Sequence, residues 1–466
     1  MKNFSTVNLN TFSKIKFKKR VLIWCSPGFG IIDNWLPIIK KLKDKQDIKI
    51  DFIFPEPSSL QLVDKNSDLF NLSERYANEV IYVGNSRRWL MTDTLIHASK
   101  SYKNSKIDKK IFNISQRLIA GNISKYIFFK KIGEYLLLMY KMLQIVRENF
   151  SHVCLYDTNL MKNVDGILCD ITVEQKNVNK LLRTELKHVQ KFSIFHGCDV
   201  LWVKPDCKSK QYAAKKPNVT VYTQSHLELD VYKKCFGILD KNIVHSGIAR
   251  HDSDWVEYIY NQQFSPNENA FDSFVLIISR PSSTYNTVER KKKALMDIYD
   301  VICTKHKLKL IVKTHPKEDI DGIDGDLYKN TLGVENYGKK WMYSHSHPLI
   351  LGKKALFAIS FFSGVAIDML AIKKPTIEYL NLENLPLYDN ENSLRDKYGK
   401  PVFQYRYVKL VLGASNKLDL EQHVKSILSN NKDSLLPLYS RYNNYFKPSG
   451  IASEIITNDI CNKIYN

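Results

Sequence analysis

The sequence predicts an α/β protein of two doubly wound domains, each built on a parallel sheet. Short apolar runs recur along the 466-residue chain, and helical patterns lie between many of them. Strands separated by helices are typical of parallel βαβ units. The length exceeds one ordinary core, and Gln262–Ser273, which contains Pro266 and no apolar period, resembles a linker. We therefore expect domains at 1–262 and 263–466, with their sheets facing each other across a cleft.

The N-terminal half opens with a strand, a glycine turn and a helix. Val21–Trp24 is the strand, Ser26–Gly30 contains the turn, and the helical pattern continues through Leu42. The glycines do not complete GxGxxG, so no dinucleotide fingerprint is present. Residues from about 108 to 149 have a mostly helical pattern. Further strands are expected at Ile50–Phe54, Glu79–Val83, Val153–Tyr156, Gly166–Cys169, Phe192–Phe195, Val219–Tyr222 and Ile243–Val244.

The same alternation restarts after the linker. The pattern predicts a helix over Val288–Lys305 and a short helix over Gly364–Ala371. Strands are expected at Phe274–Ser279, Leu308–Lys313, Ala355–Ser360 and Thr376–Leu380. The last residues are expected to form a helical tail of the second domain.

The chain is strongly basic. It has 69 lysines and arginines against 48 aspartates and glutamates, a formal net charge of +21. Such an excess attracts anionic lipid, phosphorylated substrates or nucleic acid; a lysine-rich composition on solvated faces explains it equally well. No interleaved RNP-type aromatic motif occurs, so nucleic acid is not an expected partner. The basic stretch from Lys14 to Arg20 is either a patch for an anionic membrane surface or ordinary solvated charge.

The cysteines and the apolar runs bear on the compartment. The eight cysteines stand singly with no CxxC pair, which argues against a zinc site or a thiol redox motif. Cys169 lies in an apolar run, where a reduced buried thiol is expected, and this favours the cytosol. No apolar signal segment precedes Val21, and no run reaches the roughly 18 apolar residues of a membrane span. We expect a cytoplasmic protein, with peripheral binding to the inner membrane face as an option.

Polar residues that suit catalysis follow the expected strands. Phe195-His196-Gly197 comes directly after one of them, and the carboxyl ends of parallel strands border the ligand crevice. His196 can take a proton from an acceptor hydroxyl, while Gly197 lets the backbone turn. A histidine that only satisfies loop carbonyls would give the same pattern. In Gly247-Ile248-Ala249-Arg250-His251-Asp252, Arg250 either contacts phosphate or pairs with Asp252 or Asp254; His245 and His251 are expected to be incidental.

Two later segments suit an anionic ligand. In Lys313-Thr314-His315-Pro316, the proline keeps His315 extended, and a histidine beside a lysine can donate to a diphosphate. Ser363-Gly364 opens a helix whose free N–H groups suit a phosphate, unless Ser363 is an ordinary N-cap.

Two acidic residues are expected to support this region. Asp368 can anchor a neighbouring loop. Glu378, in the strand that Lys374-Pro375 begins, either holds a ribose hydroxyl or lies at the surface. The acidic loop Asp319–Asp326 fails the calcium pattern because Ile323 stands at its fifth position, so we expect a solvated turn and no metal.

Taken in order, these segments resemble the transferases related to CDP-glycerol glycerophosphotransferases, which build teichoic acids and some bacterial capsules. The resemblance covers about residues 190–385. Five segments carry the resemblance. The family's His-Gly is similar to His196-Gly197, and its Gly-x-x-Arg-x-Asp turn is similar to Gly247, Arg250 and Asp252. Its Lys-x-His-Pro is similar to Lys313–Pro316, its Ser-Ser-x-x-x-Asp helix start to Ser363-Gly364 with Asp368, and its basic-Pro segment to Lys374-Pro375. Gly364 replaces the family's second serine, and Ile278-Ser279-Arg280-Pro281-Ser282 replaces an Ala-Pro-Thr-Trp-Arg-type segment.

The resemblance implies the GT-B fold: two Rossmann-like domains with the donor bound mainly by the second. It implies that His196 is the general base for the acceptor hydroxyl. It also implies no metal, because cations and N–H groups would stabilise the phosphates. The implied donor and phosphate ligands are Lys313, His315, Ser363, Gly364 and Arg280, and the supporting residues are Gly197, Arg250, Asp252, Asp368 and Glu378.

We therefore expect a bacterial cell-surface polysaccharide or teichoic-acid-type transferase. It would move a glycosyl or polyol-phosphate group from a CDP- or CMP-activated donor to a glycan or lipid-linked acceptor. Similar His-Pro and small-hydroxyl motifs occur in GT-B-like sialyl- and Kdo-transferases, so another nucleotide-sugar glycosyltransferase is an alternative. A GT-B nucleotide-sugar epimerase and a non-catalytic polyanion-binding scaffold are the remaining rivals.

Overall fold

The computed structural model describes most of the chain. The described residues are 17–25, 30–45, 47–54, 67–82, 163–171, 189–197, 218–262, 271–385, 387–391, 393–430, 432–446 and 450–466, with a few helical positions between 114 and 136. Several sequence predictions lie outside them: the turn at 26–29, the strand at 153–156, most of the helical stretch 108–149 and the linker at 263–270.

The N-terminal domain contains a parallel sheet of seven strands in the order β3-β2-β1-β4-β5-β6-β7. The order reverses between β1 and β4, which is where open α/β sheets bind ligands beyond the carboxyl ends of their strands. The strands are β1 (Lys19–Trp24), β2 (Ile48–Phe54), β3 (Glu79–Tyr82), β4 (Gly166–Asp170), β5 (Gln190–Ile194), β6 (Val219–Thr223) and β7 (Ile243–His245), and the helices among the described residues include α1 (Gly30–Lys43), α3 (Ser67–Tyr76) and α8 (Ser253–Tyr260).

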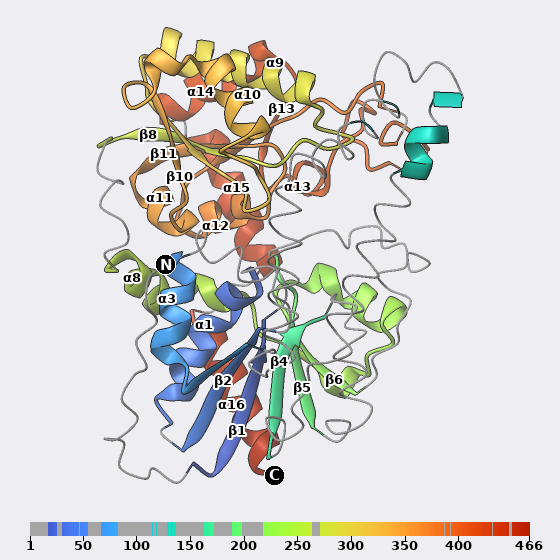
Figure 1. Ribbon diagram of the computed structural model, residues 1–466, viewed down its shortest axis with the longest axis vertical. Coiled ribbons are helices and arrows are strands. Elements are labelled where there is room, and N and C mark those ends of the chain that lie inside the picture. The colour runs from blue at the N-terminus through green and yellow to red at the C-terminus, as the bar shows by residue number, and fades with distance from the viewer. Residues whose placement is uncertain are drawn as a thin grey trace.

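The second domain contains a parallel sheet of six strands in the order β10-β9-β8-β11-β12-β13. Its strands are β8 (Phe274–Ile278), β9 (Leu310–Lys313), β10 (Trp341–Ser344), β11 (Ala355–Ser360), β12 (Thr376–Tyr379) and β13 (Leu412–Ala414). Its helices are α9 (Val288–Tyr299), α10 (Ile323–Leu332), α11 (Pro348–Lys354), α12 (Val365–Ala371), α13 (Gln404–Tyr407), α14 (Lys417–Leu428) and α15 (Lys432–Phe446). Helices α9, α10 and α14 lie over one face of the sheet, and α11 and α12 lie over the face nearer the first domain (Figure 1).

The strands form where apolar runs can be buried on both faces. All five residues of β4, β6 and β8 are buried, as expected for parallel strands covered by helices. The predicted α/β class and paired parallel sheets are therefore confirmed. The sequence prediction missed β10 and β13, which are short and only partly buried, and the helix predicted over Val288–Lys305 ends in a π-helical segment from Asp300.

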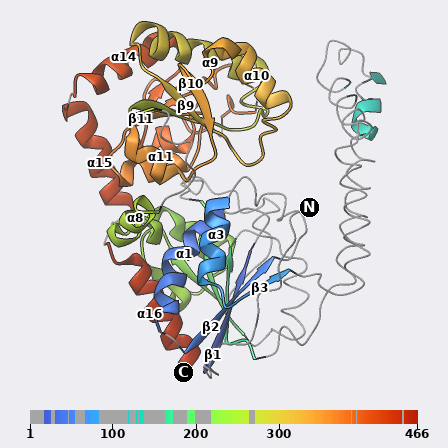
Figure 2. The same ribbon diagram turned by 60° about the vertical axis from the view of Figure 1, so that its left-hand side comes forward.

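The chain returns to the first domain at its end. Helix α16 (Ala452–Tyr465) packs its buried Ile456 and Ile460 into the same core as α1 and β1, and Figure 2 shows α15 leading down to it beside the two domains. Asp252 holds the start of α16, because its carboxylate accepts from the backbone N–H groups of Ala452 (3.0 Å) and Ser453 (2.7 Å). The predicted C-terminal tail of the second domain thus packs against the first.

Two further expectations concern cysteines and membranes. Cys169 is a buried thiol outside any disulfide, as expected, but Cys235 is disulfide-bonded. The cysteines therefore do not by themselves support a cytosolic location. Among the described helices, none is long and apolar enough to cross a bilayer.

Candidate functional site

His196 lies just beyond β5, and Asp170 at the end of β4 holds its ring. The His196 Nδ1 and Asp170 Oδ2 atoms are 2.6 Å apart, and the aspartate is buried whereas the histidine side chain is 53% exposed. An ionised Asp170 accepts the Nδ1–H, which places the ring's lone pair on Nε2. A histidine in this tautomer can accept a proton from a hydroxyl group. The sequence reasoning missed Asp170, although an acidic residue closing a buried strand was a visible signal.

The backbone before His196 is fixed from both sides. The carbonyl oxygen of Phe195 accepts from the side-chain amides of Asn34 on α1 (2.9 Å) and Gln224 after β6 (3.2 Å). Both amides are buried. Because the ring and the preceding peptide are held separately, the imidazole has a defined direction at this edge of the sheet.

Lys313 and His315 follow β9 at the carboxyl edge of the second sheet. Burial lowers the pKa of Lys313 to about 8, although Glu318 and Asp68 of α3 pull it upward. Burial and the nearby Arg280 lower the pKa of His315 to about 4. His315 is therefore neutral at pH 7. Its Nδ1 accepts from the Lys317 N–H (3.1 Å), so its proton lies on Nε2, which can donate to a ligand.

A buried glutamate, missed in the sequence, positions this loop. Glu318 accepts from the His315 N–H (2.6 Å), Lys291 Nζ (2.6 Å), the Ser279 hydroxyl (2.7 Å) and the Tyr328 hydroxyl (2.8 Å). It thereby links the end of β8, the loop after β9, α9 and α10. Burial favours the protonated form of Glu318, but Lys291 and the hydrogen bonds from His315 and Ser279 together outweigh burial, and the pKa of the carboxyl is lowered.

Arg280 joins the loops after β8 and β11. Its Nη1 donates to the carbonyl oxygen of Phe362 (2.8 Å), and its guanidinium lies 5.3 Å from the Phe362 ring centroid. Phe362 has a φ of +82°, a strained conformation for a bulky residue. The turn brings Ser363 and Gly364 to the start of α12, where the Ser363 hydroxyl accepts from the Val365 N–H (3.4 Å). Gly364 occupies the N-cap position of α12, and Ser363 stands one residue before it.

Arg250 joins the two domains rather than pairing with its sequence neighbours. Its guanidinium contacts Asp33 of α1 (3.0 Å) and Asp368 of α12 (2.9 Å). His251 Nε2 lies 2.7 Å from Asp368, and His347 Nε2 lies 2.9 Å from Asp33. We call these five buried residues the interdomain charge cluster.

This arrangement corrects two expectations and bears on a third. Arg250 pairs with neither Asp252 nor Asp254, since Asp252 is occupied by α16. His251 is a member of the cluster rather than incidental. Asp368, expected to anchor a neighbouring loop, contacts Arg250 and His251 in the segment after β7. Burial would raise the pKa of Asp33, but His347 and Arg250 outweigh it and hold the pKa at about 2. The pKa of His251 is lowered because burial outweighs its contact with Asp368.

Glu378 is buried and not at the surface. Its Oε1 accepts from Arg406 Nε (3.2 Å), and Arg406 also donates to the carbonyl oxygens of Glu378 and Leu380 (2.9 Å each). Burial raises the pKa of Glu378 despite this arginine. In this structure the residue anchors the end of β12. The structure thus gathers Lys313, His315, Arg280 and Ser363 along neighbouring strand ends, whereas Arg250, Asp252, Asp368 and Glu378 are structural ties.

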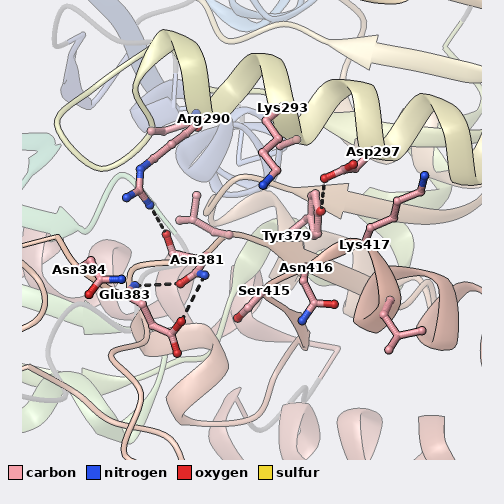
Figure 3. Close-up of a pocket in the computed structure, with 14 residues that line it drawn as sticks. Arg290, Lys293, Asp297, Tyr379, Asn381, Glu383, Asn384, Ser415, Asn416 and Lys417 are labelled. Atoms are coloured by element: carbon pink, nitrogen blue, oxygen red, sulfur yellow. Dashed lines mark hydrogen bonds between the residues drawn. The ribbon is translucent and has the colours of Figure 1, made fainter.

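A cavity of about 690 Å³ lies elsewhere on the second domain, between α9 and the loops after β12 and β13 (Figure 3). None of the predicted site residues lines it. Within the described part of the chain, no group of three or more histidine, cysteine or acidic side chains is placed to hold a metal ion.

Comparison with known proteins identifies the architecture. No family model matches the sequence, and a search of curated proteins found no relative. Among solved structures, a variant of the wall teichoic acid polymerase TagF soaked with CDPG matches with a TM-score of 0.52, at 10% identity, over 98% of this chain and 91% of that chain. The chain has the GT-B fold.

Epimerase structures match equally well. The complex of S. aureus MnaA with UDP has a TM-score of 0.51 at 11% identity, over 96% of this chain and 97% of that chain. A putative UDP-N-acetylglucosamine 2-epimerase from Listeria monocytogenes has a TM-score of 0.51 at 10% identity, over 94% of each chain. At these identities the matches establish the shared fold. They confirm the predicted GT-B class. The reaction has to be inferred from the residues of the site, because one fold serves many reactions.

Proposed function

We propose that this chain is a GT-B transferase. It moves a glycosyl or polyol-phosphate group from a CDP- or CMP-activated donor to a hydroxyl of a glycan or lipid-linked acceptor. The observation that supports this most is His196, oriented by a buried aspartate at the edge of one sheet, while Lys313, His315 and Arg280 lie at the edge of the other. An epimerase acting on a donor alone needs no base reserved for an acceptor.

In the proposed reaction, His196 Nε2 takes the proton of the acceptor hydroxyl as its oxygen attacks the donor. The new bond forms to the transferred carbon or phosphorus, and the bond to the nucleotide breaks, with the electron pair leaving on a phosphate oxygen. Lys313 and Arg280 stabilise this negative charge, and His315 Nε2–H donates a hydrogen bond to it. Because these groups supply the positive charge, we propose transfer without a metal, and activity that persists in EDTA is the corresponding test.

Asp68 supports the juxtaposition of the two halves. It belongs to α3 of the first domain, yet the charges of Lys313 and His347 in the second domain act on it. The start of α3, at the carboxyl edge of the first sheet, therefore lies near the loop that follows β9. The net charge of +21 suits a phosphorylated donor and an acceptor at an anionic membrane, so we place the enzyme at the cytoplasmic membrane face.

Two experiments test the proposal. Thermal shifts with CDP, CMP, UDP and GDP identify the nucleotide, because a ligand that binds the native state raises the unfolding temperature. With the donor known, His196→Ala should abolish turnover and leave nucleotide affinity near wild type. His226→Ala, at an exposed position after β6, is the matched control. Full activity of His196→Ala would show that His196 is not the base and would refute the proposed mechanism.

A nucleotide-sugar epimerase is the second candidate, supported by the equal fold match to 2-epimerase structures. It predicts conversion of a nucleotide-sugar in the absence of any acceptor. Incubation of the protein with nucleotide-sugar alone, followed by product analysis, separates the two reactions.

A further inference from the structure

The cavity beside α9, here called the α9 pocket, has the dimensions and the lining of a ligand site. Its volume of about 690 Å³ lies within the about 300–1,000 Å³ of typical ligand pockets. Figure 3 shows Arg290, Lys293 and Asp297 extending from α9 toward the loops that follow β12 and β13. Asn381 and Asn416 come from those loops, so amides and charged groups from three elements meet here.

Asn286 is a buried amide without an internal use. Its side chain lines the pocket and its residue is only 1% exposed. Neither its Oδ1 nor its Nδ2 has a hydrogen-bond partner among the residues that the structure describes. A buried amide left unpaired costs about 1–3 kcal/mol. An acceptor and two donors side by side are suited to the hydroxyl groups of a sugar or polyol.

The charges of the pocket favour an anion. Glu383 pairs with Lys400 (2.9 Å), and Lys417 pairs with Asp300. Arg290 donates to the carbonyl oxygen of Asn381 (2.7 Å), a contact that leaves its charge uncompensated.

The remaining charged groups are Lys293 and Asp297. Lys293 has no ion-pair partner within the described ranges. Asp297, the one remaining carboxylate, accepts from the Tyr379 hydroxyl (2.8 Å). Arg290 and Lys293 therefore outweigh Asp297.

We propose that the α9 pocket binds one unit of an anionic, hydroxyl-rich acceptor, either a sugar that carries a carboxylate or a polyol phosphate. Arg290 and Lys293 contact the anionic group, and Asn286 and Asp297 hydrogen-bond to hydroxyls. The assignment to the acceptor rests on the proposed transferase function. A second argument for an acceptor is the loop after β8. This loop carries Arg280 of the donor site and, six residues later, Asn286 of the pocket, so we propose that one acceptor chain extends past both.

Binding of three small probes tests the pocket without any turnover. Isothermal titration with glycerol 3-phosphate, glucuronate and glucose separates a phosphate, a carboxylate and an uncharged polyol. At least one anionic probe should bind more tightly than glucose. Lys293→Ala should weaken that binding about tenfold, equivalent to about 1.4 kcal/mol. The matched control Lys292→Ala removes the same charge from an exposed neighbour outside the pocket and should change affinity less than twofold.

Asn286→Ala separates a ligand role from a structural one. An amide that stabilised the fold would lower the unfolding temperature when removed; an amide reserved for a ligand should leave it unchanged or raised while probe affinity falls. The inference is overturned if no anionic probe binds better than glucose, if Lys292→Ala and Lys293→Ala act equally, or if Asn286→Ala loses stability and keeps affinity.

Nucleotide titrations keep the two proposals distinguishable. Arg280→Ala should weaken binding of the nucleotide and leave the probe unaffected, and Lys293→Ala should do the reverse. If Lys293→Ala weakens the nucleotide instead, the α9 pocket is the donor site and the acceptor assignment is wrong. If no nucleotide binds but the probes respond as expected, the transferase proposal fails and the pocket remains a binding site.

Discussion

Replacing Arg250 with methionine would test the interdomain charge cluster. Methionine retains much of the apolar stem of the arginine but removes the cation that joins Asp33 to Asp368. The two carboxylates are 9% and 4% exposed, so water cannot take the place of the guanidinium. Removing one partner of a buried ion pair typically costs about 3–5 kcal/mol, because the other charge stays buried. We expect the free energy of unfolding to fall by that amount at pH 8.

The dependence of this loss on pH has a defined sign. In the wild-type protein the pKa of Asp33 is about 2, so its contribution is fully present above the unfolded-state pKa of about 3.9 and is lost as the pH falls from there through 2. Without Arg250, burial is opposed mainly by His347, and the pKa of Asp33 should rise above its unfolded value. A raised carboxyl pKa makes the folded state less stable as pH increases. The loss should therefore be larger at pH 8 than at pH 5.

Urea unfolding at pH 5 and pH 8 measures the loss of unfolding free energy and its dependence on pH. Lys329→Met, at an exposed position on α10, controls for the loss of a surface cation and should change stability by no more than about 0.5 kcal/mol. A loss below about 1 kcal/mol for Arg250→Met, or one that is equal at both pH values, would refute the reasoning from the buried carboxylates.

Three further predictions concern the candidate site. Asp170→Asn should lower kcat on the order of 10²–10⁴-fold and leave nucleotide affinity unchanged, because His196 loses the acceptor that sets its tautomer. An unchanged kcat would show that Asp170 does not position the base. Nucleotide affinity should fall as pH rises through about 8, where Lys313 loses its proton, and Lys313→Met should lose this dependence; equal pH profiles in both proteins would contradict the assignment. Glu318→Gln should lower the free energy of unfolding by about 3 kcal/mol, because the fully buried Lys291 loses the carboxylate that it contacts. The double variant Glu318→Gln/Lys291→Met should recover most of this loss. Urea unfolding of the single and double variants measures the recovery, and losses that simply add would contradict the coupling.

The sequence was sufficient to predict the parallel strands because most of them are buried on both faces. Such strands appear as continuous apolar runs, as in β8, where all five residues are buried. In β10 only Trp341 is buried, and β13 has three residues including Gly413, so neither produces such a run. The final helix could be expected as a helix but not placed. Its packing on the first domain depends on Asp252, two hundred residues earlier in the chain.

The sequence allowed us to predict those candidate-site residues that directly follow a strand. His196, Lys313 and His315 were predicted in this way, whereas Arg280 was named only through the family resemblance. Asp170 was not found because its role depends on pairing between β4 and β5, which sets it beside Ile194, two residues before His196. Arg250 was given the wrong partners because nearby carboxylates in sequence are the simplest expectation. Its partners lie 217 and 118 residues away, and only the assembled domains bring them to it.

Helix α1 explains how the position of the base depends on the arrangement of the domains. Two consecutive residues at its start act on different parts of the molecule: Asp33 contacts Arg250 and His347, while Asn34 holds the carbonyl oxygen of Phe195 next to His196. A shift of the second domain that displaced His347 would pull on Asp33 and therefore on its neighbour. Asn34 and Gln224 both donate to the Phe195 carbonyl oxygen, so the peptide that carries His196 is held by α1 as well as by the loop after β6. The direction of the proposed base is thus tied to the same helix that holds the two domains together.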